Sequence, residues 1–326
     1  MATELESSTQ RDAPPATGTP ERWLVPLAFA AVYLIWGSTY LGIAIAIETA
    51  PPFLMAGARF LCAGLPLYLW LRLRGVPAPD RRQWSSSLVL GLLMIFGGNG
   101  LVTYAELSVP SGIAALFIAS VPLWMIVLER VLFGGAPPGR ATWLGLLLGL
   151  SGVVLLVAPS GIAARPGQTV GSLLLLVAAV SWAWGSLVSR RLPLPGSPLM
   201  VSALQMICGS VCLLAASAAL GEWRRFELAA VSGRSLLAMA YLVVFGSILG
   251  YSAYLYLLRR VSAAAAGTYA FVNPAVAVAI GWLLAGESLD PRSVLAMLLI
   301  LAGVASILAP RIRRRRRLGA PRSAAA

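Results

Sequence analysis

Arg59 lies inside an apolar run that spans residues 52–71, and its side chain could do the most specific chemistry in this sequence. A charged group within such a run costs free energy in a bilayer, so it is a functional hypothesis by default. A guanidinium that faces a cavity can bind a carboxylate or a phosphate through two parallel hydrogen bonds. Two alternatives stay open, because the side chain could also reach the headgroups at the helix end or pair with Glu48 or Glu106.

Three amide side chains also lie inside apolar runs, namely Asn99, Gln205 and Asn273. Each needs a hydrogen-bond partner there, either a solute or a neighbouring helix. Asn273 precedes Pro274, which has no backbone N–H and so leaves a carbonyl one turn earlier without its donor. A membrane helix that is locally broken in this way is a plausible binding element for a solute.

Aromatic residues recur at matched positions. The tripeptide Trp-Gly-Ser occurs twice, and its outer residues are Trp36, Ser38, Trp184 and Ser186. Two tryptophans and two serines near the middle of apolar runs predict a pseudo-symmetric cavity wall, with close helix packing through the glycines as the alternative. Further aromatic surface comes from tyrosines that could cover a flat solute or anchor the chain at the membrane surface, namely Tyr104, Tyr251, Tyr254 and Tyr269.

The sequence lacks the side chains on which most enzymes rely. It contains no His and three Cys, Cys62, Cys208 and Cys212, each inside an apolar run. We therefore expect no metal, no cofactor and no catalytic centre, and we interpret the cysteines as small apolar side chains. No acidic residue lies near the middle of a run, which favours facilitated diffusion or exchange. Glu106, at the end of one run, is the candidate for proton coupling.

The elements that must position these side chains are membrane-spanning helices. Of the 326 residues, 59% are hydrophobic and 11% are charged, and the mean hydropathy is +0.83. A water-soluble chain carries about 25% charged residues, and a membrane span needs roughly 20 apolar residues. Continuous runs of this length exclude barrel strands, so we predict an all-α integral membrane fold with ten spans. These are residues 23–47, 52–71, 85–106, 110–133, 141–159, 169–190, 198–220, 235–258, 262–286 and 293–310.

The arginines predict the orientation of these helices. Lys is absent, and with the N-terminus inside, the inner loops and tails hold nineteen arginines and the outer loops five. This positive-inside bias predicts that both termini lie in the cytoplasm. Residues 1–22 are polar and predict a disordered tail. The other tail, residues 311–326, holds the basic run from Arg311 to Arg317, which we interpret as a contact for anionic lipid headgroups; we expect no nucleic acid partner.

The chain divides into two similar halves, residues 23–159 and 169–310, at an offset near 150 residues. Besides the Trp-Gly-Ser tripeptide, the halves match at Phe-Gly-Gly, residues 96–98, and Phe-Gly-Ser, residues 245–247. Since each half has five helices, an odd number, the second half must enter the membrane from the opposite side. Inverted repeats recur in secondary transporters, where two opposed halves exchange conformations around one site.

Several segments of the two halves form a recognisable set: Trp36 to Tyr40, Pro51-Pro52 through Phe60, Asn99 through Glu106, Pro110-Ser111-Gly112 leading to Trp124, and Asn273-Pro274 with Glu287 after it. Together these segments resemble the EamA family of the drug/metabolite transporter superfamily over residues 23–310. The stretch from Tyr104 to Trp124 looks most like the branch of inner-membrane exporters of amino acids and metabolites. The resemblance implies ten helices in two EamA repeats, a multi-pass position in the bacterial inner membrane, and export of a small-molecule solute.

Two other functions stay open. A flippase for lipids or lipid-linked headgroups would use Arg59 to hold a phosphate and should have a lateral opening. A membrane enzyme would need a nucleophile with a base, or a metal cluster, and the sequence offers neither. The oligomeric state has no signal in the sequence. The runs at 141–159 and 293–310 hold few polar side chains, so we expect them to form a scaffold beside a cavity lined by the other eight helices.

Overall fold

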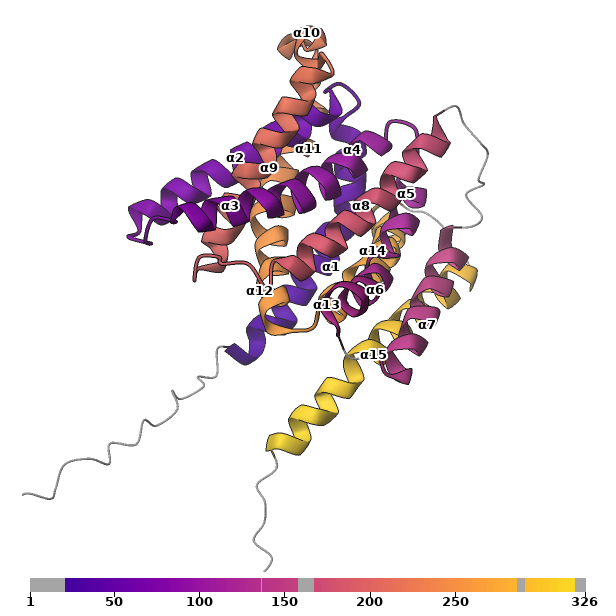
Figure 1. Cartoon of the computed structure of the whole chain (residues 1–326). Coiled ribbons are helices and arrows are strands. Elements are labelled where there is room, and N and C mark those ends of the chain that lie inside the picture. Colours follow the sequence, from indigo (N-terminus) through magenta and orange to yellow (C-terminus); the bar gives the residue numbers. More distant parts are fainter. Residues whose placement is uncertain (1–20, 136, 158–166, 286–290, 320–326) are drawn as a thin grey trace, which may run out of the picture.

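The described residues of the computed structural model are 21–135, 137–157, 167–285 and 291–319, and these residues form helices without any strand (Figure 1). Of the predicted tails, 1–22 and 311–326, residues 1–20 and 320–326 lie outside them, while residues 21–22 and 311–319 are helical. The all-α membrane fold is confirmed, whereas four of the ten predicted spans correspond to short or interrupted helices. Two of these four are the shorter apolar stretches Arg140–Leu155 and Val294–Ile307. Six helices are long and apolar enough to cross a membrane: Trp23–Ala46, Pro52–Leu73, Arg81–Ala105, Gln168–Val188, Pro198–Ala219 and Gly233–Arg260.

The helices follow the same order in the two halves of the chain. The first half contains α1 (Glu21–Ala46), α2 (Pro52–Leu73), α3 (Arg81–Leu90), the π-helical η1 (Gly91–Gly100), α4 (Leu101–Ala105), α5 (Ser111–Ile118), α6 (Val121–Phe133) and α7 (Arg140–Val157). The second half contains α8 (Gln168–Val188), α9 (Pro198–Ala219), α11 (Gly233–Tyr241), the π-helical η4 (Leu242–Tyr251), α12 (Ser252–Arg260), α13 (Ala263–Ala266), α14 (Tyr269–Ala285) and α15 (Pro291–Gly319). Two short helices, α10 (Glu222–Arg225) and η3 (Leu228–Ala230), follow α9.

Local sequence signals fix several helix ends. Pro52 is the first residue of α2, where a fixed φ suits the first turn and no N–H is needed. Asp80 caps α3 in a capping box: its carboxylate accepts the backbone N–H of Gln83 at 2.7 Å, and the Gln83 side chain accepts the N–H of Asp80 at 3.2 Å. α6 ends at Gly134, whose φ of 63° lies in the left-handed region. The predicted boundaries at 52 and 133 agree with these observed ends.

The fourth span of each half is interrupted. The first half breaks between α5 and α6, directly before Pro122, and the second half breaks between α13 and α14. A hydroxyl group adds a hydrogen bond to a carbonyl at each break, beside the backbone N–H that this carbonyl already accepts: Ser120 donates to the Phe117 carbonyl at 2.5 Å, and Thr268 donates to the Ala265 carbonyl at 2.7 Å. The two breaks therefore use the same chemistry at equivalent places.

The third span of each half contains a π-helical segment. η1 and η4 are each 10 residues long, and each continues without interruption into a following α-helix. π-Helical turns are rare, and they occur mostly at functional sites, because the additional residue per turn reorients the side chains that follow. Gly98 in η1 and Gly246 in η4 lie on the wall of the central cavity described below.

Equivalent helices of the two halves pack against each other. α2 lies along α9, and α7 lies along α15 at one edge of the molecule (Figure 1). Gly145 and Gly303 let α7 and α15 approach closely, since a Cβ on Gly303 would lie 2.7 Å from the Gly145 carbonyl oxygen. α1 packs on α14 and η4, while α8 packs on α6 and η1. These matched pairs fit two repeats of one helical unit.

Candidate functional site

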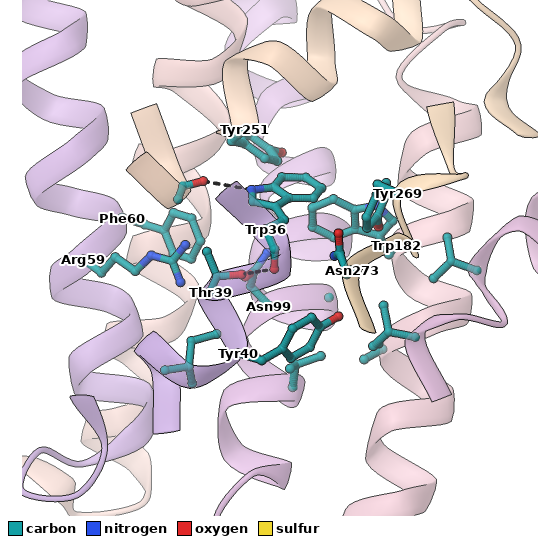
Figure 2. A pocket seen from close by; sticks show the side chains of 17 residues that line it. Trp36, Thr39, Tyr40, Arg59, Phe60, Asn99, Trp182, Tyr251, Tyr269 and Asn273 are labelled. Carbon is teal, nitrogen blue, oxygen red and sulfur yellow. Dashed lines mark hydrogen bonds between the residues drawn. The ribbon is translucent and has the colours of Figure 1, made fainter. Parts of the chain in front are cut away.

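A central cavity lies between α1, α2, η1, α4, α5, α6, α8, η4 and α14 (Figure 2). Measured as space open to the centre of a water molecule, its volume is about 60 Å³, which is room for roughly four waters or a small solute. Among the described residues, none of α7 or α15 lines it, as expected for a scaffold. None of α9 lines it either, so the prediction that the span at 198–220 would do so is wrong. Its polar and aromatic wall is formed by Trp36, Thr39, Tyr40, Arg59, Asn99, Trp182, Tyr251, Tyr269 and Asn273.

Arg59 is buried, with 3% of its surface exposed, and its guanidinium borders this cavity (Figure 2). Its Nε donates to the Ser247 hydroxyl at 2.9 Å, and its Cζ lies 4.7 Å from the centre of the Phe60 ring. Gly246 leaves room for the side chain, because a Cβ there would lie 2.7 Å from Arg59 Nη2. The position is that of a cavity-facing group and not of a side chain extended to the headgroups.

Arg59 has no acidic partner in the described part of the chain. Neither alternative partner is paired with it: Glu48 lies 3.7 Å from Arg234 at the surface, and the Glu106 carboxylate has no hydrogen-bond partner among the described residues. A guanidinium has five N–H donors in a fixed fork, and the hydrogen bond to Ser247 uses one of them. Arg59 is therefore a buried cation with donors available to an anionic group in the cavity.

Two tryptophans form the aromatic centre of the cavity. The Trp36 ring meets the Trp182 ring edge-on, with centroids 5.4 Å apart, and meets Tyr269 at 4.8 Å. Their indole N–H groups are already satisfied, since Trp36 donates to the Gly246 carbonyl and Trp182 donates to the Tyr254 hydroxyl, both at 3.1 Å. With these donors occupied, the rings offer the cavity mainly their apolar surfaces.

The second tryptophan differs from the predicted one. Trp184 does not line the cavity, and 44% of its surface is exposed. Trp182, two residues earlier, is buried and takes its place in the wall. Two residues correspond to about 200° of rotation around an α-helix, so these side chains point to opposite sides. The Trp-Gly-Ser match does not show which face of α8 lines the cavity. That face carries Ala178 and Trp182, which are four residues apart and therefore lie on the same side of the helix.

Several predicted residues support the wall without lining it. Ser186 shares a hydrogen bond of 2.8 Å with the Tyr254 hydroxyl, which itself holds Trp182. Gln205 accepts from the Tyr251 hydroxyl at 2.5 Å. Ser38 is hydrogen-bonded to Tyr241 at 2.6 Å, and Tyr104 stacks on Phe53 with centroids 5.1 Å apart. These side chains orient their neighbours, and of the residues that they contact directly, Tyr251, which is bound by Gln205, lines the cavity.

Two amides that the sequence singled out do line the cavity. Asn99 lies in η1 and Asn273 lies in α14, and both face the space between the helices (Figure 2). The Asn273 side-chain oxygen is buried and has no hydrogen-bond partner among the described residues. The sequence interpretation missed Thr39 and Tyr40, which line the cavity one turn after Trp36 on α1. Helical spacing from Trp36 was the signal that could have found them.

Among the described residues, no three His, Cys, Asp or Glu side chains form a group that could hold a metal ion. The cavity offers instead one cation, two amides, hydroxyl groups and aromatic rings. Such a wall can bind a solute that carries an anionic group at one end and an apolar or planar part at the other. It contains no nucleophile paired with a base.

Comparison with known proteins identifies relatives along almost the whole chain. The model of the EamA-like transporter family matches residues 23–158 and again 169–309. The uncharacterized inner membrane transporter YedA of Escherichia coli K12 is 42% identical over 286 residues, which cover 87% of this chain and 90% of that protein. The uncharacterized transporter YoaV of Bacillus subtilis is 25% identical over 86% of this chain and 95% of its own length. A crystal structure that shares 21% identity superposes with a TM-score of 0.70 and covers 91% of this chain and 99% of that chain.

Proposed function

Because the chain belongs to the EamA-like transporter family and is a multi-pass inner-membrane protein, we propose that it is a secondary transporter that exports small metabolites. The solutes are amino acids or related amphipathic molecules that bind in the central cavity. The observation that supports this choice is Arg59, a buried cation on the cavity wall without an acidic partner in the described part of the chain. An anionic group of the solute would supply that partner.

In the proposed mechanism, the cavity opens alternately to the two faces of the membrane. Residues 23–159 and 169–310 form two inverted halves of five spans each, with both termini in the cytoplasm. The interrupted fourth spans count as single crossings in this arrangement, as do the shorter apolar stretches within α7 and α15. The breaks and π-helical segments lie around the cavity, where small changes in helix direction would open one side and close the other.

The basic tail has a separate role in the proposal. α15 continues from the apolar stretch Val294–Ile307 to Gly319, so the run from Arg311 to Arg317 extends the helix beyond that stretch. Arginines directly outside a membrane span attract anionic headgroups. Their side chains lie outside the described set.

Solute counterflow in proteoliposomes tests the proposed function. The panel contains neutral, aromatic and anionic amino acids together with cationic drugs, and the variants are Arg59→Ala and Arg59→Lys. We expect flux of a carboxylate-bearing solute to fall about 10- to 100-fold in Arg59→Ala, because a hydrogen bond to a charged group contributes about 1.5–3 kcal/mol. Arg59→Lys should keep the charge, lose the bidentate geometry and show an intermediate loss.

The matched control is Arg234→Ala, which removes an exposed arginine and its surface ion pair with Glu48. We expect its flux to equal that of the wild type. Carboxylate flux that survives Arg59→Ala would contradict the role of Arg59 in binding, and absence of flux for every solute would contradict the proposed function. A lipid scrambling assay on the same vesicles would then test a flippase.

A further inference from the structure

Glu106 is a half-buried residue with a buried carboxylate, and it does not line the central cavity. It directly follows α4, and neither of its carboxylate oxygens is exposed or has a hydrogen-bond partner among the described residues. The side chain borders a hollow between Ala44 of α1 and the turn formed by residues 107–111. A carboxylate without water or a partner is strongly disfavoured, so the group must either bind a cation or hold a proton.

None of the described residues around Glu106 provides a cation to its carboxylate. From α1, Tyr40 faces it closely enough for the two groups to interact electrostatically. From α2, the charged residue is Arg59, whose Nε donates instead to Ser247. α5 contributes Ser111 to the hollow, and the start of α8 meets the turn through Ser108, which donates to the Gly167 carbonyl at 3.3 Å. On its own helix, Tyr104 is stacked on a phenylalanine ring.

We propose that Glu106 is a proton-binding site that is loaded and emptied once in each transport cycle. The inference rests on the proposed function, because the cycle is what carries the side chain between buried and hydrated surroundings. In the conformation seen here the carboxylate takes one proton from water and becomes a neutral carboxylic acid. When the carboxyl group itself becomes exposed to water, the O–H bond breaks, the proton returns to water and the carboxylate is left hydrated.

Tyr40 provides the connection between this site and the solute. Its side chain lines the central cavity and lies within electrostatic range of Glu106 when that carboxyl group is ionised. Because linkage between two sites is reciprocal, a solute whose binding changes the proton affinity of Glu106 by a given factor has its own affinity changed by the same factor when Glu106 is protonated. Proton movement and solute movement are then coupled, and a pH gradient can drive accumulation.

Infrared spectroscopy of the full-length protein in lipid nanodiscs tests proton binding without any solute. We expect the wild type at neutral pH to show the carbonyl band of a protonated carboxylic acid, and this band to disappear in Glu106→Gln. The control Glu48→Gln removes an exposed acid that lies beside Arg234, and it should keep the band. Absence of the band in the wild type would mean that a cation holds Glu106 ionised, which would overturn the proposal.

Vesicle transport tests the coupling. The readout is the ratio of accumulation driven by an imposed pH gradient to counterflow without one, for a panel solute that the wild type moves. We expect this ratio to fall at least about 10-fold in Glu106→Gln and to recover in Glu106→Asp, which restores a titratable carboxyl group. A ratio in Glu106→Gln equal to that of the wild type would overturn the coupling. If the wild type moves no solute, the proposed function fails, while the infrared band still decides whether Glu106 holds a proton.

Discussion

Glu222 joins the two halves of the protein at the start of α2, and its removal should destabilise that helix. The residue is the first of α10 and is buried. Its carboxylate accepts the backbone N–H groups of Phe53 at 3.3 Å and of Leu54 at 2.8 Å. These donors belong to the first turn of α2, where helical N–H groups have no partner within the helix. Pro51 directly before α2 makes no side-chain cap, so Glu222 supplies it from 169 residues away.

The magnitude follows from the two contacts. A hydrogen bond to a charged group contributes about 1.5–3 kcal/mol, and a negative charge at a helix N-terminus adds about 0.3–1 kcal/mol. The bond to Phe53 is long, and water can partly replace both bonds. We therefore expect Glu222→Ala to lower the free energy of unfolding by about 2–4 kcal/mol. Glu222→Gln keeps an acceptor oxygen and loses the charge, so its effect should be about half as large.

Thermal unfolding in detergent micelles, followed by tryptophan fluorescence, measures this loss. The matched control is Glu227→Ala, an exposed acid in the same connecting segment, whose effect should stay within about 0.5 kcal/mol. α2 also carries Arg59, seven residues after Pro52, so Glu222→Ala should weaken solute binding as well. Equal melting temperatures for Glu222→Ala and Glu227→Ala would refute the capping interpretation.

Two further pairs of variants test the packing of the aromatic wall. Tyr254→Phe removes the hydroxyl that binds Trp182 and Ser186 and should destabilise the protein by about 1–3 kcal/mol. Tyr256→Phe removes a buried hydroxyl that lacks a partner among the described residues, so its unfolding temperature should not fall. Gly250→Ala places a Cβ 2.5 Å from Trp36 Nε1 and should cost about 1–3 kcal/mol in the same assay. Gly139→Ala, which meets nothing within 4 Å, should leave stability unchanged; equal effects within either pair would contradict the packing described here.

Much of the fold could be predicted from apolar run length and turn chemistry. The run that begins at Pro52 and the run that ends before Gly134 have boundaries that can be read from the sequence, because Pro fixes φ at a helix start and Gly readily adopts the left-handed conformation after a helix end. The breaks between α5 and α6 and between α13 and α14 were not predicted at these places, and the local break expected at Pro274 is not found, because α14 continues through it from Tyr269 to Ala285. They depend on which carbonyls find a hydroxyl partner in the folded chain, and the surrounding sequence stays apolar throughout. The π-helical segments were missed for a similar reason, since they change the hydrogen-bond register without changing composition.

A site residue could be predicted from the sequence where its side chain is costly to place in a membrane helix. Arg59 stood out because charge is expensive in a membrane helix, and it borders the cavity. The hydrogen-bond partners of the site residues could not be predicted, because packing between helices distant in sequence brings Ser247 to Arg59 and Gln205 to Tyr251. Sequence similarity between the halves suggested that Trp184 lines the cavity. The side of α8 that faces the cavity depends on how the helix is rotated about its axis, which a matching tripeptide does not determine.

The paired π-helical segments also bear on the evolutionary origin of the two halves of the chain. A π-helical turn is a local irregularity that has no strong sequence signature and rarely arises. Here the described residues contain one such segment in each half, of equal length and in the equivalent helix. The family model matches residues 23–158 and again 169–309, so inheritance of both segments from one duplicated ancestral unit accounts for them with a single event.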